Sequence, residues 1–199
     1  MKTIYILRHS KPDSKKEENK SISLSHEGIL LAKRYLNKDI FKNINNVYCS
    51  DYRRSYETGY QSNKKIIIDK RLGERIAGIV DNETLTPLQY FYKQVEDENY
   101  SFKNGETRKQ IEQRMYNALM DIVNDNDSSI IITHGTSLTF LLMKLCKVQF
   151  PNNDKKIRKI IFNEKVIFNN TFNYLETFKL TFDSNKLINI ESIGNYEDI

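Results

Sequence analysis

The chain has 199 residues, of which 39% are hydrophobic and 29% charged, and its formal net charge is +5. This length suits one α/β domain with its own core, and no apolar run reaches the roughly 18 residues needed to cross a bilayer. The lysines are scattered, without the continuous basic stripe of a nucleic-acid-binding surface. We therefore expect one domain over residues 1–199, monomeric or homodimeric, that binds neither nucleic acid nor membrane.

The N-terminus passes at once into the apolar run Ile4 to Leu7, which is too short for the core of a signal peptide. The two cysteines, Cys49 and Cys146, lie in apolar runs and have no partners at metal-ligand spacing. We expect both thiols to be reduced core residues and the protein to be cytoplasmic.

Strand-like and helical segments alternate along most of the chain. Apolar or β-branched runs predict strands, and capped or amphipathic stretches predict helices. In chain order we predict a strand over 4–7, a helix over 25–37, a strand over 47–49, a helix over 51–62, a strand over 66–68, helices over 87–96 and 107–124, a strand over 130–133 and a helix over 138–145. This alternation predicts an α/β fold: a three-layer, doubly wound, mostly parallel sheet with helices on both faces.

Three stretches depart from the alternation. Residues 71–105 are less regular and predict a helical insertion over the functional site. Its aromatic residues form either a lid over a ligand or a core or dimer contact. Residues 124–127 predict a tight loop. From Thr171 onward polar and apolar residues alternate, which predicts one or two antiparallel strands at a sheet edge.

Two histidines stand where predicted strands end. Arg8 and His9 follow the first apolar run directly, and His134 and Gly135 follow the last one. In open α/β sheets, ligands bind at the carboxyl ends of the strands. The planar donor fork of arginine suits phosphoryl oxygens. The sequence therefore predicts an anion site, with phosphate as the natural anion.

An arginine and a glutamate extend this set. Arg53 and Arg54 lie about one helical turn beyond the second predicted strand, from where either can point back over the same sheet edge. Glu74 follows the third strand, and a carboxyl group over a cationic pocket can donate a proton to a leaving oxygen. The residues alone favour Arg54 over Arg53 as the partner of Arg8, without excluding Arg53.

Taken in order, these segments resemble the histidine phosphatase superfamily, in its phosphoglycerate mutase-like branch. The similarity runs from residue 4 to about residue 138 and selects Arg54 over Arg53. The matching segments are residues 8–10 (family Arg-His-Gly), 24–32 (Leu-Thr-x-x-Gly-x-x-Gln-Ala), 50–58 (Ser-Pro-Leu-x-Arg-Ala-x-x-Thr), 72–74 (Leu-x-Glu), 105–107 (Gly-Glu-Ser) and 134–135 (His-Gly).

The resemblance implies a role for each site residue. His9 would be the nucleophile that forms a phosphohistidine, and Glu74 would protonate the leaving alcohol and then activate water. Arg8, Arg54 and a protonated His134 would bind the phosphoryl oxygens. Because these groups supply the positive charge, no metal or cofactor is implied. The expected partner is a small phosphorylated substrate.

Four further positions bear on the pocket. Ser10 replaces the family glycine, and either narrows the pocket or adds a hydroxyl donor. Asp51 replaces a proline and places a carboxylate near Arg54, where it could compete with a phosphate. Arg75 keeps part of the Glu-Arg-His-Tyr-Gly string of the family's glycolytic mutases, and Gly135 follows the second histidine.

Two alternatives to a phosphatase stay open. A mutase is less favoured, because that string is incomplete and the mutases' Ser-x-Trp-Asn is absent from a chain without tryptophan. A non-catalytic, phosphate-binding regulatory module is favoured by the departures at Ser10 and Asp51 alone. Substrate specificity should lie in residues 76–104 and in the tail beyond Phe150.

Overall fold

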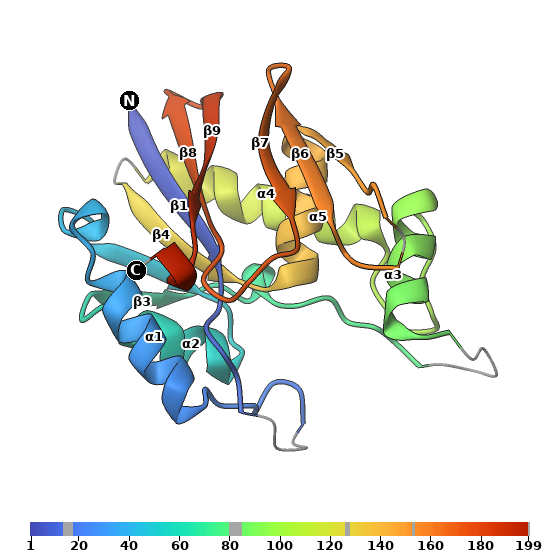
Figure 1. Ribbon diagram of the computed structural model, residues 1–199, viewed down its shortest axis with the longest axis horizontal. Helices are drawn as coiled ribbons and strands as arrows, with labels where there is room; N and C mark the ends of the chain where they lie inside the picture. The colour runs from blue at the N-terminus through green and yellow to red at the C-terminus, as the bar shows by residue number, and fades with distance from the viewer. Residues whose placement is uncertain (14–17, 80–84, 126–127, 153, 199) are drawn as a thin grey trace.

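The computed structural model describes residues 1–13, 18–79, 85–125, 128–152 and 154–198 (Figure 1). Residues 80–84 of the predicted insertion and 126–127 of the predicted loop lie outside the described residues. The strands and longer helices are β1 (Lys2–Arg8), α1 (His26–Leu36), β2 (Asn46–Cys49), α2 (Arg53–Tyr60), β3 (Lys65–Ile68), α3 (Pro87–Glu96), α4 (Arg108–Asn124), β4 (Ser129–Thr133), α5 (Gly135–Leu145), β5 (Lys147–Gln149), β6 (Arg158–Phe162), β7 (Lys165–Asn170), β8 (Thr177–Asp183) and β9 (Lys186–Gly194). Short 3-10 helices cover Asp39–Phe41, Lys70–Leu72 and Tyr196–Asp198.

The central sheet has six strands in the order β3-β2-β4-β1-β8-β9. Strands β3, β2, β4 and β1 are parallel to one another, whereas β8 runs antiparallel to β1 and to β9. The chain moves outward from β1 to β2 and β3 and then returns to β4. Right-handed crossovers in the two directions place the connecting helices on opposite faces, so the prediction of a doubly wound sheet is confirmed.

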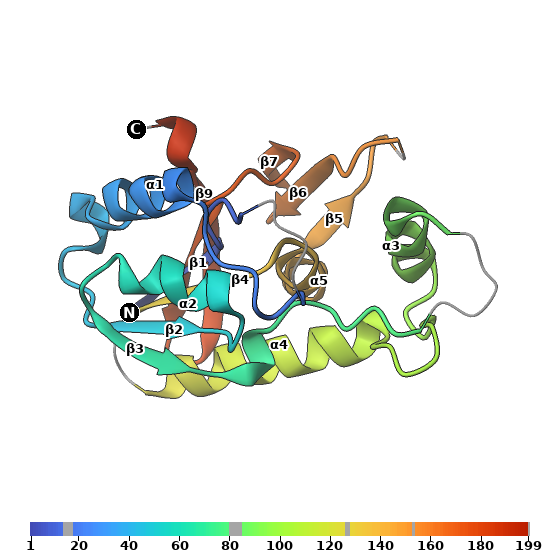
Figure 2. The same ribbon diagram turned by 90° about the horizontal axis from the view of Figure 1, so that it is seen from below.

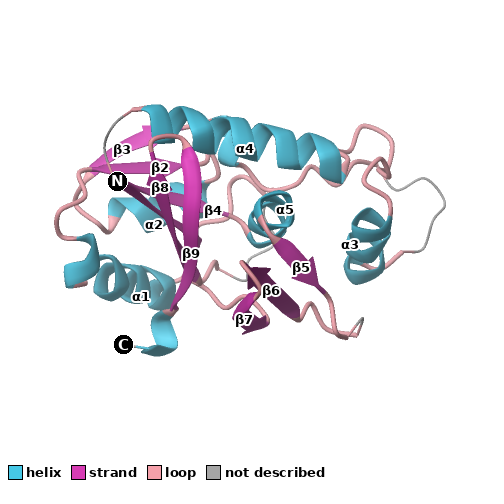
Figure 3. Cartoon of the chain, turned by 90° about the horizontal axis from the view of Figure 1, so that it is seen from above, coloured by secondary structure: helices cyan, strands magenta, loops and turns pink. Residues whose placement is uncertain are grey.

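Helices α1 and α2 cover one face of this sheet, and α4 and α5 cover the other (Figures 2 and 3). Leu7 of β1 belongs to the same buried cluster as Tyr35 of α1, and Ile6 belongs to the opposite cluster with Met115 of α4. Successive side chains of a strand point to opposite faces, so β1 serves two cores. Within the described residues, no helix has the length and apolar character required to traverse a membrane.

Three helices, α1, α3 and α4, begin directly after a residue whose side chain caps the helix N-terminus. Ser25 accepts a hydrogen bond from the Gly28 N–H at 3.0 Å, and Thr86 and Thr107 each form a capping box. The predicted starts of α1, α3 and α4 are therefore confirmed to within one residue. Helix α5 begins three residues earlier than predicted, because the chain passes from β4 into the helix through His134 alone.

The tail differs from the prediction. Strands β5, β6 and β7 form a separate antiparallel sheet that the sequence analysis did not predict. Strand β8 begins at Thr177 rather than Thr171, and it lies inside the central sheet, so β9 is the edge strand. The missed strands are three to six residues long and rich in Lys and Asn, which obscures their alternation.

The aromatic residues of α3 pack inward. Tyr90 and Phe91 are buried, and the Phe91 ring stacks on Phe140 of α5 with their centroids 5.6 Å apart. Phe150 meets Phe91 edge-on at 5.5 Å. Of the alternatives considered for these aromatic residues, the structure shows the core contact.

Gly28 lies where α1 meets the segment that follows β1. A β-carbon at Gly28 would overlap the carbonyl oxygen of Lys11, whereas one at Gly135 would have ordinary contacts, the nearest with Arg8 Nε at 3.6 Å. Glycine at position 28 thus permits a close backbone approach.

We expect Gly28→Ala to lower the free energy of unfolding by about 2 kcal/mol or more, because the backbone must shift to relieve the overlap. Gly135→Ala is the control and should lose less than about 0.5 kcal/mol, since alanine favours the helix. Urea denaturation of both variants measures the difference. Equal losses would contradict the proposed close approach.

Candidate active site

The carboxyl ends of the four parallel strands converge at one edge of the sheet. Arg8 ends β1 and is followed by His9, whose backbone N–H donates to Thr133 of β4 at 2.9 Å. His134 follows β4, and Glu74 follows β3 after one short helix. A cavity of about 240 Å³ at this edge is lined by Arg8, His9, Glu74, Gly135, Thr136, Lys156, Arg158, Thr171 and Phe172.

His9 is 5% exposed and has a defined tautomer. Its Nδ1 lies 2.7 Å from the carbonyl oxygen of Ser10, which can only accept, so Nδ1 carries the proton. The lone pair is then on Nε2, which accepts from Arg54 Nε at 3.1 Å. Burial, followed by the proximity of His134 and the charges of Arg8 and Arg54, lowers the pKa of His9 well below 6.5. His9 is therefore a neutral imidazole with a free lone pair, as a nucleophile requires.

Two arginines flank His9 with backbone carbonyls as their partners. Arg8 Nη1 donates to Phe172 at 2.7 Å, and Arg54 Nη1 donates to Asn19 at 2.5 Å. Arg8 Nε is buried without a hydrogen-bond partner. Within the described chain, neither guanidinium forms an ion pair with a carboxylate. Buried donors without partners are rare, so both arginines are suited to an arriving anion.

His134 is buried at the N-terminus of α5. Its Nε2 is 2.8 Å from the Ser50 hydroxyl, which can donate to it, and its Nδ1 is buried without a partner. Burial and the charges of Arg54 and Arg114 lower the pKa of His134 well below 6.5. This environment favours a neutral ring, whereas the resemblance implied a protonated one. With Ser50 donating to Nε2, a neutral His134 still presents an Nδ1–H to an anion.

Glu74 lines the same cavity as Arg8 and His9. Its Oε1 accepts from the Arg75 N–H at 2.9 Å and from the N–H and hydroxyl of Ser137, each at 3.3 Å. Its Oε2 forms no hydrogen bond within the described residues. One carboxyl oxygen is therefore fixed by the first turn of α5, and the other is available for proton transfer.

The two departures from the family pattern are accommodated away from the anion site. The Ser10 hydroxyl donates to the Gly28 carbonyl at 2.7 Å, and the Ser10 N–H donates to the Thr58 hydroxyl at 3.0 Å. Neither expected effect of Ser10 on the pocket is observed. Asp51 forms an ion pair with Lys20 at 2.8 Å. Its expected competition for Arg54 is likewise not observed.

Of the two remaining predicted residues, Gly135 and Arg75, only the first lines the cavity. Gly135 lines the cavity, and its missing side chain leaves room beside Arg8 Nε. Arg75 is not among the lining residues. Its Nη1 donates to Gln94 at 2.8 Å, and its guanidinium lies 4.4 Å from the centre of the Tyr90 ring. Arg75 therefore links Glu74 to α3.

Sequence reasoning missed two cations of the site. Lys156 and Arg158 line the cavity from the segment that leads into β6. Lys156 lies in a turn and Arg158 begins β6, so their spacing of two residues is not that of a strand and gave no clear signal in the sequence. Ser50 and Ser137, which orient His134 and Glu74, were also missed.

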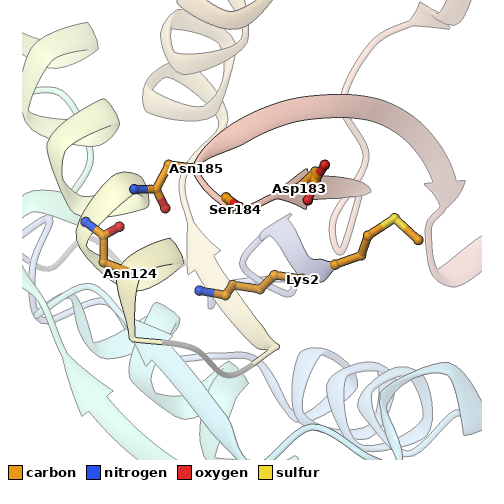
Figure 4. Close-up of a pocket in the computed structure, with 6 residues that line it drawn as sticks. Lys2, Asn124, Asp183, Ser184 and Asn185 are labelled. Carbon is orange, nitrogen blue, oxygen red and sulfur yellow. The ribbon is translucent and has the colours of Figure 1, made fainter.

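A larger cavity of about 550 Å³ lies at the opposite edge of the sheet, where β1 begins (Figure 4). Its lining is Met1, Lys2, Asn124, Asp183, Ser184 and Asn185. This lining pairs no nucleophile with a base, so the reactive groups favour the smaller cavity. Among the residues that the structure describes, no group of three or more His, Cys, Asp or Glu is placed to hold a metal ion.

Comparison with known proteins identifies a family and a shared fold. A sequence model of the histidine phosphatase superfamily (branch 1) matches residues 4–158. A mycobacterial glucosyl-3-phosphoglycerate phosphatase in complex with VO3 is 17% identical, with a TM-score of 0.68 over 98% of this chain and 100% of that chain. A putative alpha-ribazole-5'-P phosphatase from Escherichia coli is 14% identical, with a TM-score of 0.66 over 98% of each chain. The protein histidine phosphatase SixA, complexed with tungstate, is 12% identical, with a TM-score of 0.55 over 96% of each chain. These identities show a shared fold, and no curated protein matches the sequence.

We expect the imidazoles of His9 and His134 to stay neutral between about pH 6 and 8 in the ligand-free protein, since their pKa values are lowered. Inorganic phosphate should raise the pKa of His134, because a nearby dianion favours the charged ring. Ring ¹⁵N chemical shifts measure both effects, with His134→Gln for assignment. A protonation midpoint at or above 6.5 in either ligand-free ring would contradict this description.

Proposed function

The chain belongs to the histidine phosphatase superfamily (branch 1), and from this premise we propose that it hydrolyses phosphomonoesters through a phosphohistidine at His9. The substrate is a small phosphorylated molecule, and neither a metal nor another cofactor takes part. The environment of His9 carries the proposal: a buried neutral ring, held at Nδ1 by Ser10, with its lone pair beside Arg54.

In the first step, Nε2 of His9 attacks phosphorus. The N–P bond forms as the P–O bond to the leaving alcohol breaks. Arg54 Nε turns from Nε2 to a phosphoryl oxygen, and the unpaired donors Arg8 Nε and His134 Nδ1 are available to the others. Donors placed in advance stabilise the charge of the transition state at little cost of reorganisation.

Glu74 accounts for the protons of both steps. It gives a proton to the leaving oxygen, so the alcohol departs neutral. As a carboxylate, it then takes a proton from water, whose oxygen attacks the phosphohistidine. The N–P bond breaks, its electron pair returns to Nε2, and inorganic phosphate leaves. The uncommitted Oε2 and the position of Glu74 in the cavity of His9 support this role.

We expect His9→Ala to lower the hydrolysis of p-nitrophenyl phosphate by at least about 10³-fold, because the covalent route is lost. After rapid quenching of ³²P-labelled substrate, wild-type protein should carry acid-labile label and His9→Ala none. His26→Ala, at an exposed histidine of α1, is the matched control and should behave as wild type.

Label that survives acid, or label on His9→Ala, would show that the nucleophile is assigned wrongly. Label without release of inorganic phosphate, but with transfer to an organic acceptor, would favour the mutase alternative. No label and no release from any tested monoester would favour the regulatory module.

We expect Glu74→Gln to slow alkyl phosphates by about 10² to 10⁴-fold but p-nitrophenyl phosphate much less, since a good leaving group departs without a proton. Steady-state kcat/KM for the two substrate classes measures the difference. Glu96→Gln, at an exposed position on α3, should leave both rates unchanged. An equal loss on both classes would refute the role as a proton donor.

A further inference from the structure

The cavity beside His9 holds more positive charge than one phosphoryl group uses. Arg8, Lys156 and Arg158 line it, and Glu74 is the carboxylate among its lining residues. Arg8 serves the phosphoryl position, which leaves the other two cations unassigned. We propose that Lys156 and Arg158 bind a second anionic group of the substrate, a carboxylate or a second phosphate. The inference rests on the proposed function and specifies its substrate class.

Arg158 is 4% exposed and has no carboxylate partner within the described residues. Its Nε donates to the Thr139 hydroxyl at 2.7 Å, and its Nη1 donates to the Lys156 carbonyl at 2.6 Å. Its guanidinium lies 4.1 Å from the centre of the Phe172 ring. Its Nη2 forms no hydrogen bond in the described chain. Burial and the charge of Arg8 lower the pKa of Arg158 to about 10, which reflects the cost of an unpaired buried charge.

Lys156, like Arg158, lies over an aromatic ring and has no ion-paired carboxylate among the described residues. Its ammonium lies 4.6 Å from the centre of the Phe91 ring, and it forms no hydrogen bond or ion pair within the described part of the chain. Burial, followed by the charges of Arg158 and Arg75, lowers its pKa to about 8. Glu74 is the carboxylate that shares their cavity, but neither cation forms an ion pair within the described residues. Two neighbouring cations without a paired carboxylate form a site for an anion.

The segment that carries Lys156 is held in place by α3, beside which it lies (Figures 1 and 3). The Tyr92 hydroxyl is 3.0 Å from the Asn152 carbonyl and 2.9 Å from that of Lys155. The Phe150 ring packs edge-on against Tyr92 at 5.7 Å. The insertion therefore contacts the segment that carries Lys156 and holds part of the site in place without a ligand.

Phe172 joins the two cationic positions. Its carbonyl accepts from Arg8 at 2.7 Å, and its ring lies under the Arg158 guanidinium at 4.1 Å. The same cavity thus runs from His9 to Arg158. The second anionic group should therefore belong to the molecule that carries the phosphoryl group, a few bonds away from it.

Binding to the His9→Ala protein tests the proposal without consuming the ligand. Isothermal titration calorimetry compares 3-phosphoglycerate with glycerol 3-phosphate, which has a hydroxymethyl group in place of the carboxylate. A second pair, propane-1,3-diol bisphosphate and 3-hydroxypropyl phosphate, tests a second phosphate. In at least one pair the doubly anionic ligand should bind about 10-fold or more tightly, because hydrogen bonds to charged groups are strong. The pair that shows the preference identifies the second group.

Adding Lys156→Met to the His9→Ala protein should reduce that preference at least about 5-fold, since the apolar stem over Phe91 is kept and the charge is lost. Lys155→Met, at the exposed neighbour, is the matched control and should retain the preference. No preference in either pair, or equal preference in the Lys156 and Lys155 variants, would overturn the second subsite. Failure of the wild-type protein to hydrolyse p-nitrophenyl phosphate would instead overturn the proposed function, so the two failures are distinguishable.

Discussion

The site depends on holding the guanidinium groups of Arg8 and Arg54 inside the protein without an ion-paired carboxylate among the described residues. Backbone carbonyls of Phe172 and Asn19 orient Arg8 and Arg54, yet they do not neutralise their charge. The resulting positive potential, added to burial, keeps the imidazole of His9 neutral. One electrostatic arrangement therefore supplies both attraction for an anion and a lone pair for attack. A carboxylate next to either arginine would weaken both properties together.

Much of this site could be predicted from the sequence, because strand ends in a parallel sheet meet at one edge. His9 and His134 come directly after apolar runs and Glu74 lies in the segment that follows the third run, which predicted that they lie together before any side chain was located. The behaviour of Ser10 and Asp51 could not be predicted in this way. Their partners, Gly28 and Lys20, are distant in sequence, and only the folded backbone brings them within hydrogen-bonding distance.

The part of the fold that escaped prediction is also the part that supplies the second pair of cations. Strands β5 to β7 form their own antiparallel sheet, in which β5 contacts α5 and β7 contacts β9, and their sequences show no clear alternation. The spacing of Lys156 and Arg158 was visible in the sequence. Among many surface lysines, though, nothing in the sequence distinguished a buried arginine and a half-buried lysine from solvated ones. Burial is a tertiary property, and here it depends on the rings of Phe91 and Phe172.

The burial of Arg158 affects how the binding of an anion depends on ionic strength. Mobile ions weaken attraction between exposed charges separated by more than about 8 Å at physiological ionic strength, whereas pairs shielded from solvent are screened far less. The scattered surface lysines can hasten the approach of an anion in dilute buffer, and this advantage fades in the cell. The attraction between the buried Arg158 guanidinium and a bound anion is screened little. The lifetime of the bound complex should therefore vary much less with ionic strength than the rate of encounter.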